Sequence, residues 1–263
     1  MADKKKEVAE TNSAEIIPFD PSMFEADAGS GLENMGQDDL ALPFLKILGG
    51  MSKELDVLEE ARKGDIYNTV SGVVSKGKEG LRVIPVAYQR RFIVWAPLGE
   101  GTGAPVAIFA PTDTLPEVER SKEDNKDYLK DGSGNYLEET HQHYVIVLYE
   151  NGSAETALVA MKSTQLKKSR KWNSMISSLT MQGKNGPFTP PRFSHVYNLK
   201  TQLEENAKGS WHGWEMSREG PVKDAVIYQR AKDFAASVMS GEVVVKHQDE
   251  SVGGAGGSGD APF

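Results

Sequence analysis

The residues best suited to binding chemistry gather in one window of the sequence, Thr156–Leu203. This window contains eight basic residues and no acidic one, although the chain of 263 residues has a formal net charge of −8. Lysine and arginine neutralise phosphate groups and aromatic rings stack on bases, so an interleaved basic and aromatic pattern is typical of surfaces that bind nucleic acids. The aromatic residues of the window are Trp172, Phe188, Phe193 and Tyr197. We therefore expect a surface that binds polyanions.

A helix and a loop must position these basic residues. Helical periodicity over residues 163–181 places Trp172 on the apolar side, as a core anchor, and turns the basic residues outward. The Gly- and Pro-rich segment 183–193 predicts a rigid loop. The expected phosphate contacts are Lys162, Lys167, Lys168, Arg170, Lys171, Lys184 and Arg192, and the expected stacking residues are Phe188 and Phe193. The alternative is a solvated basic helix and loop that dock on the chain's own acidic residues.

A second candidate surface lies in the β-rich segment 81–97. If the alternation of a strand holds after Pro85, the side chains of Tyr88, Arg90 and Phe92 share one face. An aromatic, basic, aromatic ladder suits a platform for base stacking. The other face would then carry Ala87, Arg91, Ile93 and Trp95. The alternative is that these aromatic residues belong to the core and the arginine side chains extend past them to solvent.

His141 and His143 are the residues that could bind a metal ion. They are two positions apart, which on a strand puts both imidazoles on one face, and Glu138 and Glu139 are close in sequence. No third ligand follows at a metal-site spacing, so a structural role is favoured. The sequence contains no catalytic signature and carboxylates are scarce near the basic window. We predict a protein that is not an enzyme and needs no cofactor or metal.

Composition limits the classes of protein that fit. No apolar run approaches the roughly 18 residues of a membrane span, and the amino terminus lacks the apolar stretch of a signal peptide. The chain has no cysteine, which excludes disulfides and thiolate metal sites and favours a cytoplasmic location. Three regions are expected: a disordered acidic arm over residues 1–37, a folded domain over 38–245, and a disordered Gly-rich tail over 246–263.

The folded domain is expected to be mainly β with added helices. A short helix is predicted within residues 38–50, and Asn151-Gly152 predicts the turn of a β-hairpin, which implies an antiparallel sheet. Residues 112–140 predict a long polar loop. The chain should close with an amphipathic helix over residues 221–241. This order of elements is compatible with an α+β fold built on an antiparallel sheet.

The end of the chain resembles a known recruiting motif. Asp260-Ala261-Pro262-Phe263 resembles the Asp-x-Pro-Phe tip of bacterial single-stranded-DNA-binding proteins, which docks on replication and repair partners. The resemblance covers Asp260, Pro262 and Phe263. It implies that this tail binds replication proteins such as a polymerase, helicase or primase.

The body of the chain resembles a set of tailed-phage proteins described as single-stranded-DNA-binding. The similar segments, within residues 35–245, include DLALPFLKIL, VIPVAYQRRFIVW, KSTQLKKSRKWNSM and NGPFTPPRFSHVY. The resemblance implies an OB-like, partly open antiparallel barrel with a basic helix, which binds single-stranded DNA during replication, recombination and repair in the host cytoplasm. A single-strand annealing protein and a metal-dependent DNA-processing enzyme remain as alternatives, and the oligomeric state, with a homodimer as one option, is open.

Overall fold

The computed structural model describes residues 22–36, 39–97, 99–206 and 209–247. The chain divides into two compact units, Met1–Gly36 and Gln37–Phe263. In the described part of the first unit, Ser22–Ala26 form the short helix α1. The tail residues with the expected recruiting role lie outside the described residues; they are Asp260, Pro262 and Phe263. The fold of interest is therefore that of the second unit.

Two long antiparallel strands organise the second unit. β4 (Leu81–Trp95) pairs with β8 (Tyr136–Leu148) from Arg82 to Trp95, with a bulge between Pro85 and Ala87. Proline lacks an N–H donor, which accounts for a bulge next to Pro85. The other strands of this eight-stranded sheet are β5 (Ala107–Phe109), β6 (Val118–Arg120), β7 (Asp127–Leu129), β9 (Ala154–Lys162), β12 (His195–Asn206) and β13 (Gly209–Pro221). Their order is β13-β12-β4-β8-β7-β6, with β5 beside β4 and β9 beside β8.

The sheet is not closed, because among the described strands β9 has β8 as its one neighbour and β13 has β12; Leu158 of β9 also forms an isolated parallel bridge with Phe44. A smaller sheet consists of β1 (Leu45–Ile47), β2 (Ile66–Asn68) and β3 (Val74–Ser75), and residues that flank this sheet are hydrogen-bonded to β9 and β12. Leu158 N–H donates to the carbonyl of Pro43, and Thr201 N–H donates to the carbonyl of Gly77, each at 2.8 Å. A Cβ at Gly77 would collide with the Gly64 carbonyl, so only glycine fits this close approach.

The predicted helix within residues 38–50 is wrong. Leu45–Ile47 form β1 instead and pair with β2 in the register Leu45↔Asn68 to Ile47↔Ile66. Leu45 and Leu48 are buried, so the apolar pattern was recognised, but a short apolar run has no period that separates strand from helix. The short helix α2 (Glu54–Val57) follows in the connection to β2.

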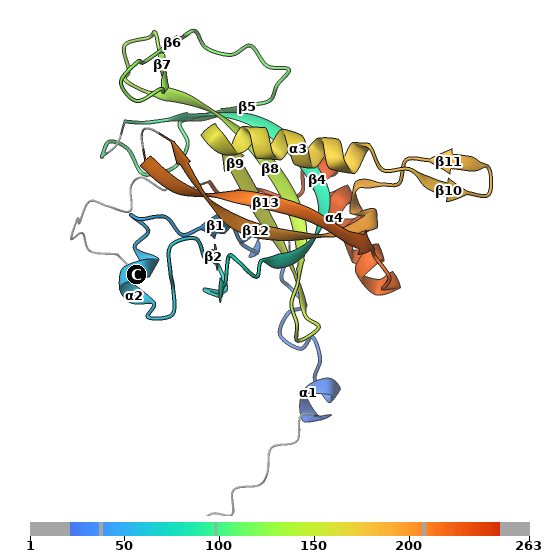
Figure 1. Ribbon diagram of the computed structural model, residues 1–263. Helices are drawn as coiled ribbons and strands as arrows, with labels where there is room; N and C mark the ends of the chain where they lie inside the picture. Colours follow the sequence, from blue (N-terminus) through green and yellow to red (C-terminus); the bar gives the residue numbers. More distant parts are fainter. Residues whose placement is uncertain (1–21, 37–38, 98, 207–208, 248–263) are drawn as a thin grey trace, which may run out of the picture. The chain divides into compact units, whose positions relative to one another are not determined.

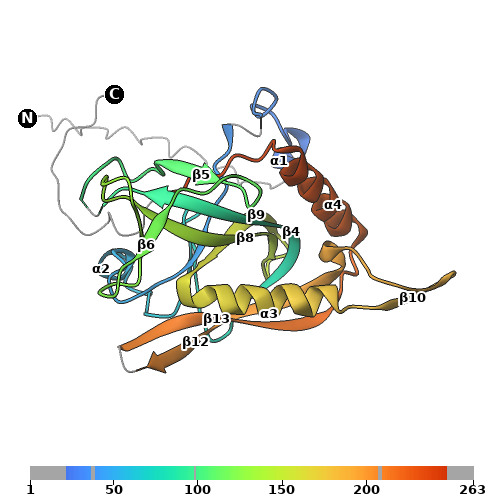
Figure 2. The same cartoon turned by 90° about the horizontal axis from the view of Figure 1, so that it is seen from above.

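One helix packs on each face of the β4–β8 pair (Figure 2). The 3-10 turn η2 (Ser163–Gln165) leads into α3 (Leu166–Ser177), whose Trp172 and Ile176 join the core cluster that contains Val83 and Val145. The predicted core anchor Trp172 is confirmed, since its side chain is fully buried. The helix ends before the predicted residue 181. On the opposite face, α4 (Ala225–Ser240) packs Phe234 against the cluster that contains Tyr144.

Helix α4 is bounded by the residues expected of a helix. Asp224 accepts hydrogen bonds from the N–H groups of Val226 and Ile227, as an N-cap does. Gly241 ends the helix with φ of 81°, a left-handed conformation that costs glycine little. The predicted closing helix is therefore confirmed, with its start four residues later than residue 221.

Two hairpins complete the unit. The predicted turn at Asn151-Gly152 joins β8 and β9 and is confirmed. Segment 183–193, predicted to be a rigid loop, begins as part of a second hairpin, β10 (Met181–Gly183) with β11 (Gly186–Phe188), which extends away from the sheet (Figure 1). The 3-10 turn η3 (Arg192–Ser194) then leads into β12. The fold is mainly β with added helices, and no helix in the described residues is long and apolar enough to cross a membrane.

Candidate nucleic-acid interface

The register of β4 and β8 assembles the first candidate surface. Tyr88 lies opposite His143, Arg90 opposite His141 and Phe92 opposite Glu139. Residues directly opposite on paired strands project on the same side of a sheet, so these six side chains share the α3 face. The predicted alternation after Pro85 is confirmed, and Arg91 lies opposite Thr140 on the other face.

The ladder on β4 joins rings and guanidinium groups. The Arg90 Cζ lies 5.3 Å from the ring centroid of Phe92, and the Tyr88 ring lies 5.1 Å from that of His143. The side chain of Arg90 is 44% exposed, whereas Tyr88 and Phe92 are half-buried. Burial raises the pKa of the Tyr88 phenol, although the charges of Arg90 and Arg192 oppose the shift. The ladder therefore lies partly in the core and partly at the surface, and Arg90 is its exposed member.

A buried serine on α3 joins the two histidines. Ser169 Oγ lies 2.7 Å from His141 Nδ1 and 2.7 Å from His143 Nε2, and all three side chains are buried. Burial lowers the pKa of His141 and lowers that of His143 well below its ordinary value. Both imidazoles are therefore neutral at pH 7, and each carries one donor and one acceptor nitrogen.

The direction of the hydrogen bonds follows from the two ends of this network. Arg192 Nη2, which can only donate, lies 2.8 Å from His143 Nδ1. His143 Nε2–H then donates to Ser169, whose hydroxyl donates to His141 Nδ1. His141 Nε2–H donates to Glu139 Oε1 at 3.0 Å. We call this series of bonds from Arg192 to Glu139 the arginine–glutamate chain.

Every imidazole nitrogen of His141 and His143 has a partner within the arginine–glutamate chain. A metal ion would have to displace a buried hydrogen bond to reach either ring. Among the described residues no group of three or more His, Cys, Asp or Glu side chains could hold a metal ion. The geometry explains the His-x-His spacing by its bonds to Ser169.

Arg192 is turned inward rather than toward the surface. Its Nη1 donates to Asn173 Oδ1 at 2.9 Å, and its Cζ lies 5.7 Å from the ring centroid of Tyr88 and 6.0 Å from that of Trp172. Burial lowers its pKa to about 10, so the group stays charged at neutral pH. Trp172 in turn stacks on His143 at 4.7 Å with an interplanar angle of 22°. The guanidinium therefore holds α3 against the sheet.

The exposed face of α3 carries the remaining positive charge. Lys167, Arg170 and Lys171 are exposed, as expected, and neither lysine forms an ion pair with a described residue. Arg170 Nη2 lies 3.8 Å from Glu139 Oε1, and Arg90 Nη1 lies 3.9 Å from the same oxygen. Glu139 thus links the basic helix to the aromatic ladder. The two predicted surfaces form one, which we call the α3-side surface: Tyr88, Arg90, Phe92, Glu139, Lys167, Arg170 and Lys171.

Other predicted contact residues lie elsewhere. Lys162 projects from the opposite face of the sheet, 3.3 Å from Glu138, and Lys168 is half-buried in an ion pair with Glu204. Phe193 packs toward α4, with its ring 5.3 Å from that of Tyr228. The alternative of basic residues docked on the chain's own acids therefore holds for part of the window.

The hairpin of β10 and β11 carries Lys184 and Phe188 away from the sheet. Lys184 lies in its two-residue turn, and Phe188 is 46% exposed. The Phe188 ring lies against Gly183, where an added Cβ would come within 3.1 Å of it. The hairpin thus presents one ring and one charge at a distance from the α3-side surface.

Sequence reasoning did not find Ser169 or Asn173. Ser169 occupies the buried stripe of α3 three residues before Trp172, where an apolar residue is the rule. A serine in such a stripe needs a hydrogen-bond partner, and the His-x-His pair 26 and 28 residues earlier supplies it. A serine in the apolar stripe of a helix, together with a His-x-His pair on a strand, was the sequence signal for this contact.

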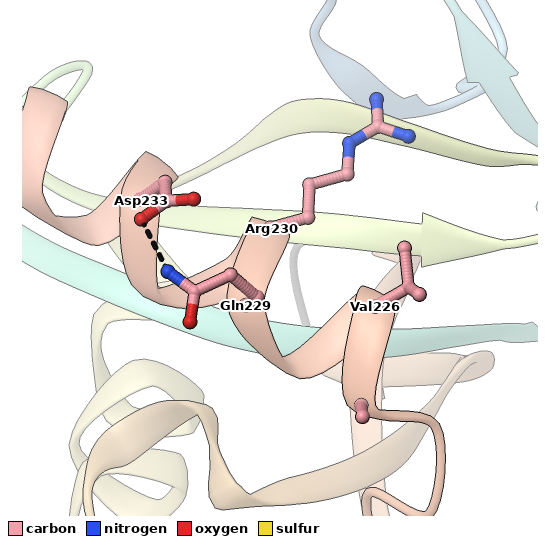
Figure 3. Close-up of a pocket in the computed structure, with 5 residues that line it drawn as sticks. Val226, Gln229, Arg230 and Asp233 are labelled. Atoms are coloured by element: carbon pink, nitrogen blue, oxygen red, sulfur yellow. Dashed lines mark hydrogen bonds between the residues drawn. The ribbon is translucent and has the colours of Figure 1, made fainter.

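A surface pocket lies on α4, away from the α3 face. Ala225, Val226, Gln229, Arg230 and Asp233 line it, and Gln229 donates to Asp233 at 2.8 Å (Figure 3). Its polar residues are bonded to one another or to the backbone, since Arg230 donates to the Ala154 carbonyl. The pocket adds nothing to the α3-side surface.

Comparison with known proteins places the chain in a phage family. No curated protein and no solved structure matches it. Residues 8–244 match the family described as Pam3 phage gp34-like protein, which covers all the described strands and helices. The chain therefore belongs to the Pam3 phage gp34-like family and is a phage protein.

Proposed function

We propose that this phage protein binds single-stranded DNA without sequence preference and protects it during replication and recombination. The observation that carries the proposal is the junction of the ladder Tyr88–Arg90–Phe92 with the exposed basic face of α3. Rings beside a row of cations are what sequence-independent binding of a single strand requires, because every base has a stacking face and every nucleotide has a phosphate.

The proposal assigns roles by position on the α3-side surface. Arg90, Lys167, Arg170 and Lys171 contact phosphates. Tyr88 and Phe92 stack on bases, and the hairpin residues Lys184 and Phe188 provide a second contact. It leaves out residues that are paired internally or project elsewhere, namely Lys162, Lys168, Arg192 and Phe193.

The fold and the tail complete the proposal. The consecutive antiparallel strands β13-β12-β4-β8-β9, with α3 packed on one face, support an OB-like description, and the missing β9–β13 pairing makes such a barrel partly open. Recruitment of replication proteins through Asp260, Pro262 and Phe263 rests on the sequence resemblance, because the tail lies outside the described residues.

The proposal is tested by fluorescence anisotropy with labelled single-stranded DNA, duplex DNA and single-stranded RNA over a salt series. We expect preference for single strands over duplex and a linear loss of log affinity with log salt. Replacing Lys167 and Lys171 together by Ala should reduce the slope by about 1.4, which is two phosphates at about 0.7 each.

The matched control replaces two exposed lysines by Ala: Lys223, which lies just before α4, and Lys232, which lies on it. This variant has the same change of net charge but leaves the α3-side surface intact. Equal losses in the two double variants would show that only net charge matters, and absence of binding by the wild type would refute the function itself.

A further inference from the structure

Glu139 has an unusual position on the α3-side surface, because it is a carboxylate at the junction that we assign to phosphates. Its Oε1 lies 3.0 Å from His141 Nε2, 3.8 Å from an Arg170 nitrogen and 3.9 Å from an Arg90 nitrogen. The two arginines come from different elements, α3 and β4. A single negative charge therefore lies between two cations that come from different elements.

The three contacts of Glu139 differ in strength. The bond from His141 is within ordinary hydrogen-bond distance and is the last bond of the arginine–glutamate chain, so the carboxylate is fixed from its buried side. The arginine contacts exceed hydrogen-bond distance and involve charge alone. The side chains of Arg90 and Arg170 are 44% and 63% exposed, against 26% for Glu139. The carboxylate is held by a hydrogen bond, whereas the two guanidinium groups contact it by charge alone and are the more exposed side chains.

A surface whose only task was to bind phosphate would gain nothing from this carboxylate, since it neutralises part of the positive charge. While no ligand is bound, the Glu139 carboxylate occupies the place next to the two arginines that a phosphate would take. It keeps the like-charged guanidinium groups side by side and offsets their repulsion.

We propose that Glu139 is a resident counter-charge that a phosphate of the bound single strand replaces on Arg90 and Arg170. This inference rests on the proposed function and concerns the control of its affinity. The phosphate must compete with Glu139, so each binding event gains less than two free arginines would give, and the bound strand exchanges more readily. Such weakening suits a protein that coats DNA and must be displaced by later enzymes.

The test compares Glu139→Gln with Glu138→Gln by anisotropy with labelled oligo-dT over a salt series from 0.1 to 1 M. A glutamine at 139 still accepts the bond from His141 but carries no charge. We expect the salt slope to become steeper by about 0.7, which is about fivefold tighter binding at 0.1 M relative to 1 M. Glu138 is the neighbouring residue, on the opposite face and 3.3 Å from Lys162; its replacement should leave slope and affinity unchanged.

A double variant tests whether Glu139→Gln acts through Arg90 rather than through an indirect effect on folding. In an Arg90→Gln background, Glu139→Gln should gain less affinity than in the wild type, because one of the two neutralised cations is gone. Unchanged or weaker binding by Glu139→Gln would overturn the counter-charge role and indicate that the acid only orients the arginines. If wild-type protein does not bind oligo-dT at any salt concentration, the proposed function fails, and the inference falls with it.

Discussion

The two faces of the β4–β8 pair carry polar networks of similar size that end in different ways. On the α3 face, the arginine–glutamate chain begins at the inward-facing Arg192 and ends at Glu139, next to two exposed arginines. It passes through the sheet-to-helix contact at Ser169. Charge is therefore present at both of its ends, and one end reaches the surface.

The network on the α4 face runs from Arg91 through neutral side chains to His247, the last residue that the structure describes. Arg91 donates to Gln89 at 2.8 Å, the Tyr144 hydroxyl lies within hydrogen-bond distance of Gln89 and Gln142, and Gln142 donates to His247 at 2.7 Å. Burial lowers the pKa of His247 to about 4, and the charges of Lys162 and Arg91 act in the same direction. This network fastens residue 247 to the sheet.

The difference shows how one pair of strands serves two tasks. Because side chains alternate, consecutive residues such as Arg90 and Arg91 belong to different networks. The α3 face exposes the charged groups of Arg90 and Arg170 to solvent, where a ligand can contact them. On the α4 face, Gln142 binds His247 and attaches that end of the described residues to the sheet. We therefore expect perturbations of the two faces to separate binding from stability.

The largest expected effect comes from the large rings on the two faces. Trp172→Ala and Phe234→Ala should each lower the free energy of unfolding by about 3–5 kcal/mol, the usual loss for a large buried ring. Only Trp172 stacks on His143 and lies beside Arg192, so only its loss should also weaken DNA binding. Urea denaturation and anisotropy at a temperature where both variants are folded check this. Equal effects on binding would remove the distinction between the faces.

An intermediate effect is expected from pH. The folded-state pKa values of His141, His143 and His247 are all lowered from 6.5, chiefly by burial. The unfolded chain therefore binds protons near pH 6.5 while the folded chain stays neutral. Stability should be full above pH 6.5 and fall as pH decreases, by up to about 1.4 kcal/mol per pH unit for each histidine.

Variants of the two faces assign that pH dependence. His247→Gln and His143→Gln should each flatten the decline of stability between pH 6.5 and pH 5, measured by urea denaturation at fixed ionic strength. His143→Gln should also lower stability at pH 7.5, because it breaks the arginine–glutamate chain in the core. A decline as steep as that of the wild type in both variants would assign the effect to other groups.

Sequence patterns predicted the features that depend on neighbouring residues. The turn at Asn151-Gly152, the alternation of Tyr88, Arg90 and Phe92, and the inward side of Trp172 were all correct. Each follows from a period of two or 3.6 residues or from the conformational preference of a turn. These features determine which side chains share a face.

The features that were missed depend on contacts between distant segments. β1 forms because Leu45–Ile47 pair with residues about 20 positions later, which a local apolar pattern does not reveal. The partner of His143 on η3, Arg192, is 49 positions away, and its charge alone predicted an exposed phosphate contact. The basic window was identified correctly as unusual, but which of its cations face solvent depends on the acids Glu138, Glu139 and Glu204, outside it.

The smallest expected effect, and the sharpest comparison, uses two consecutive arginines. Arg90→Gln and Arg91→Gln remove the same charge from adjacent positions of β4 on opposite faces. Arg90→Gln should lower the salt slope for oligo-dT by about 0.7, which corresponds to about fivefold weaker binding at 0.1 M relative to 1 M salt. Arg91 is committed to Gln89, so Arg91→Gln should leave the slope unchanged.

Because the two variants have identical net charge, long-range electrostatic attraction is the same in both, and any difference between them reports position alone. Anisotropy titrations at four salt concentrations give the slopes directly. Equal slopes for the two variants would mean that the strand does not distinguish the faces of the sheet. A larger loss for Arg91→Gln would move the proposed DNA surface to the side of α4, where Lys162 also lies.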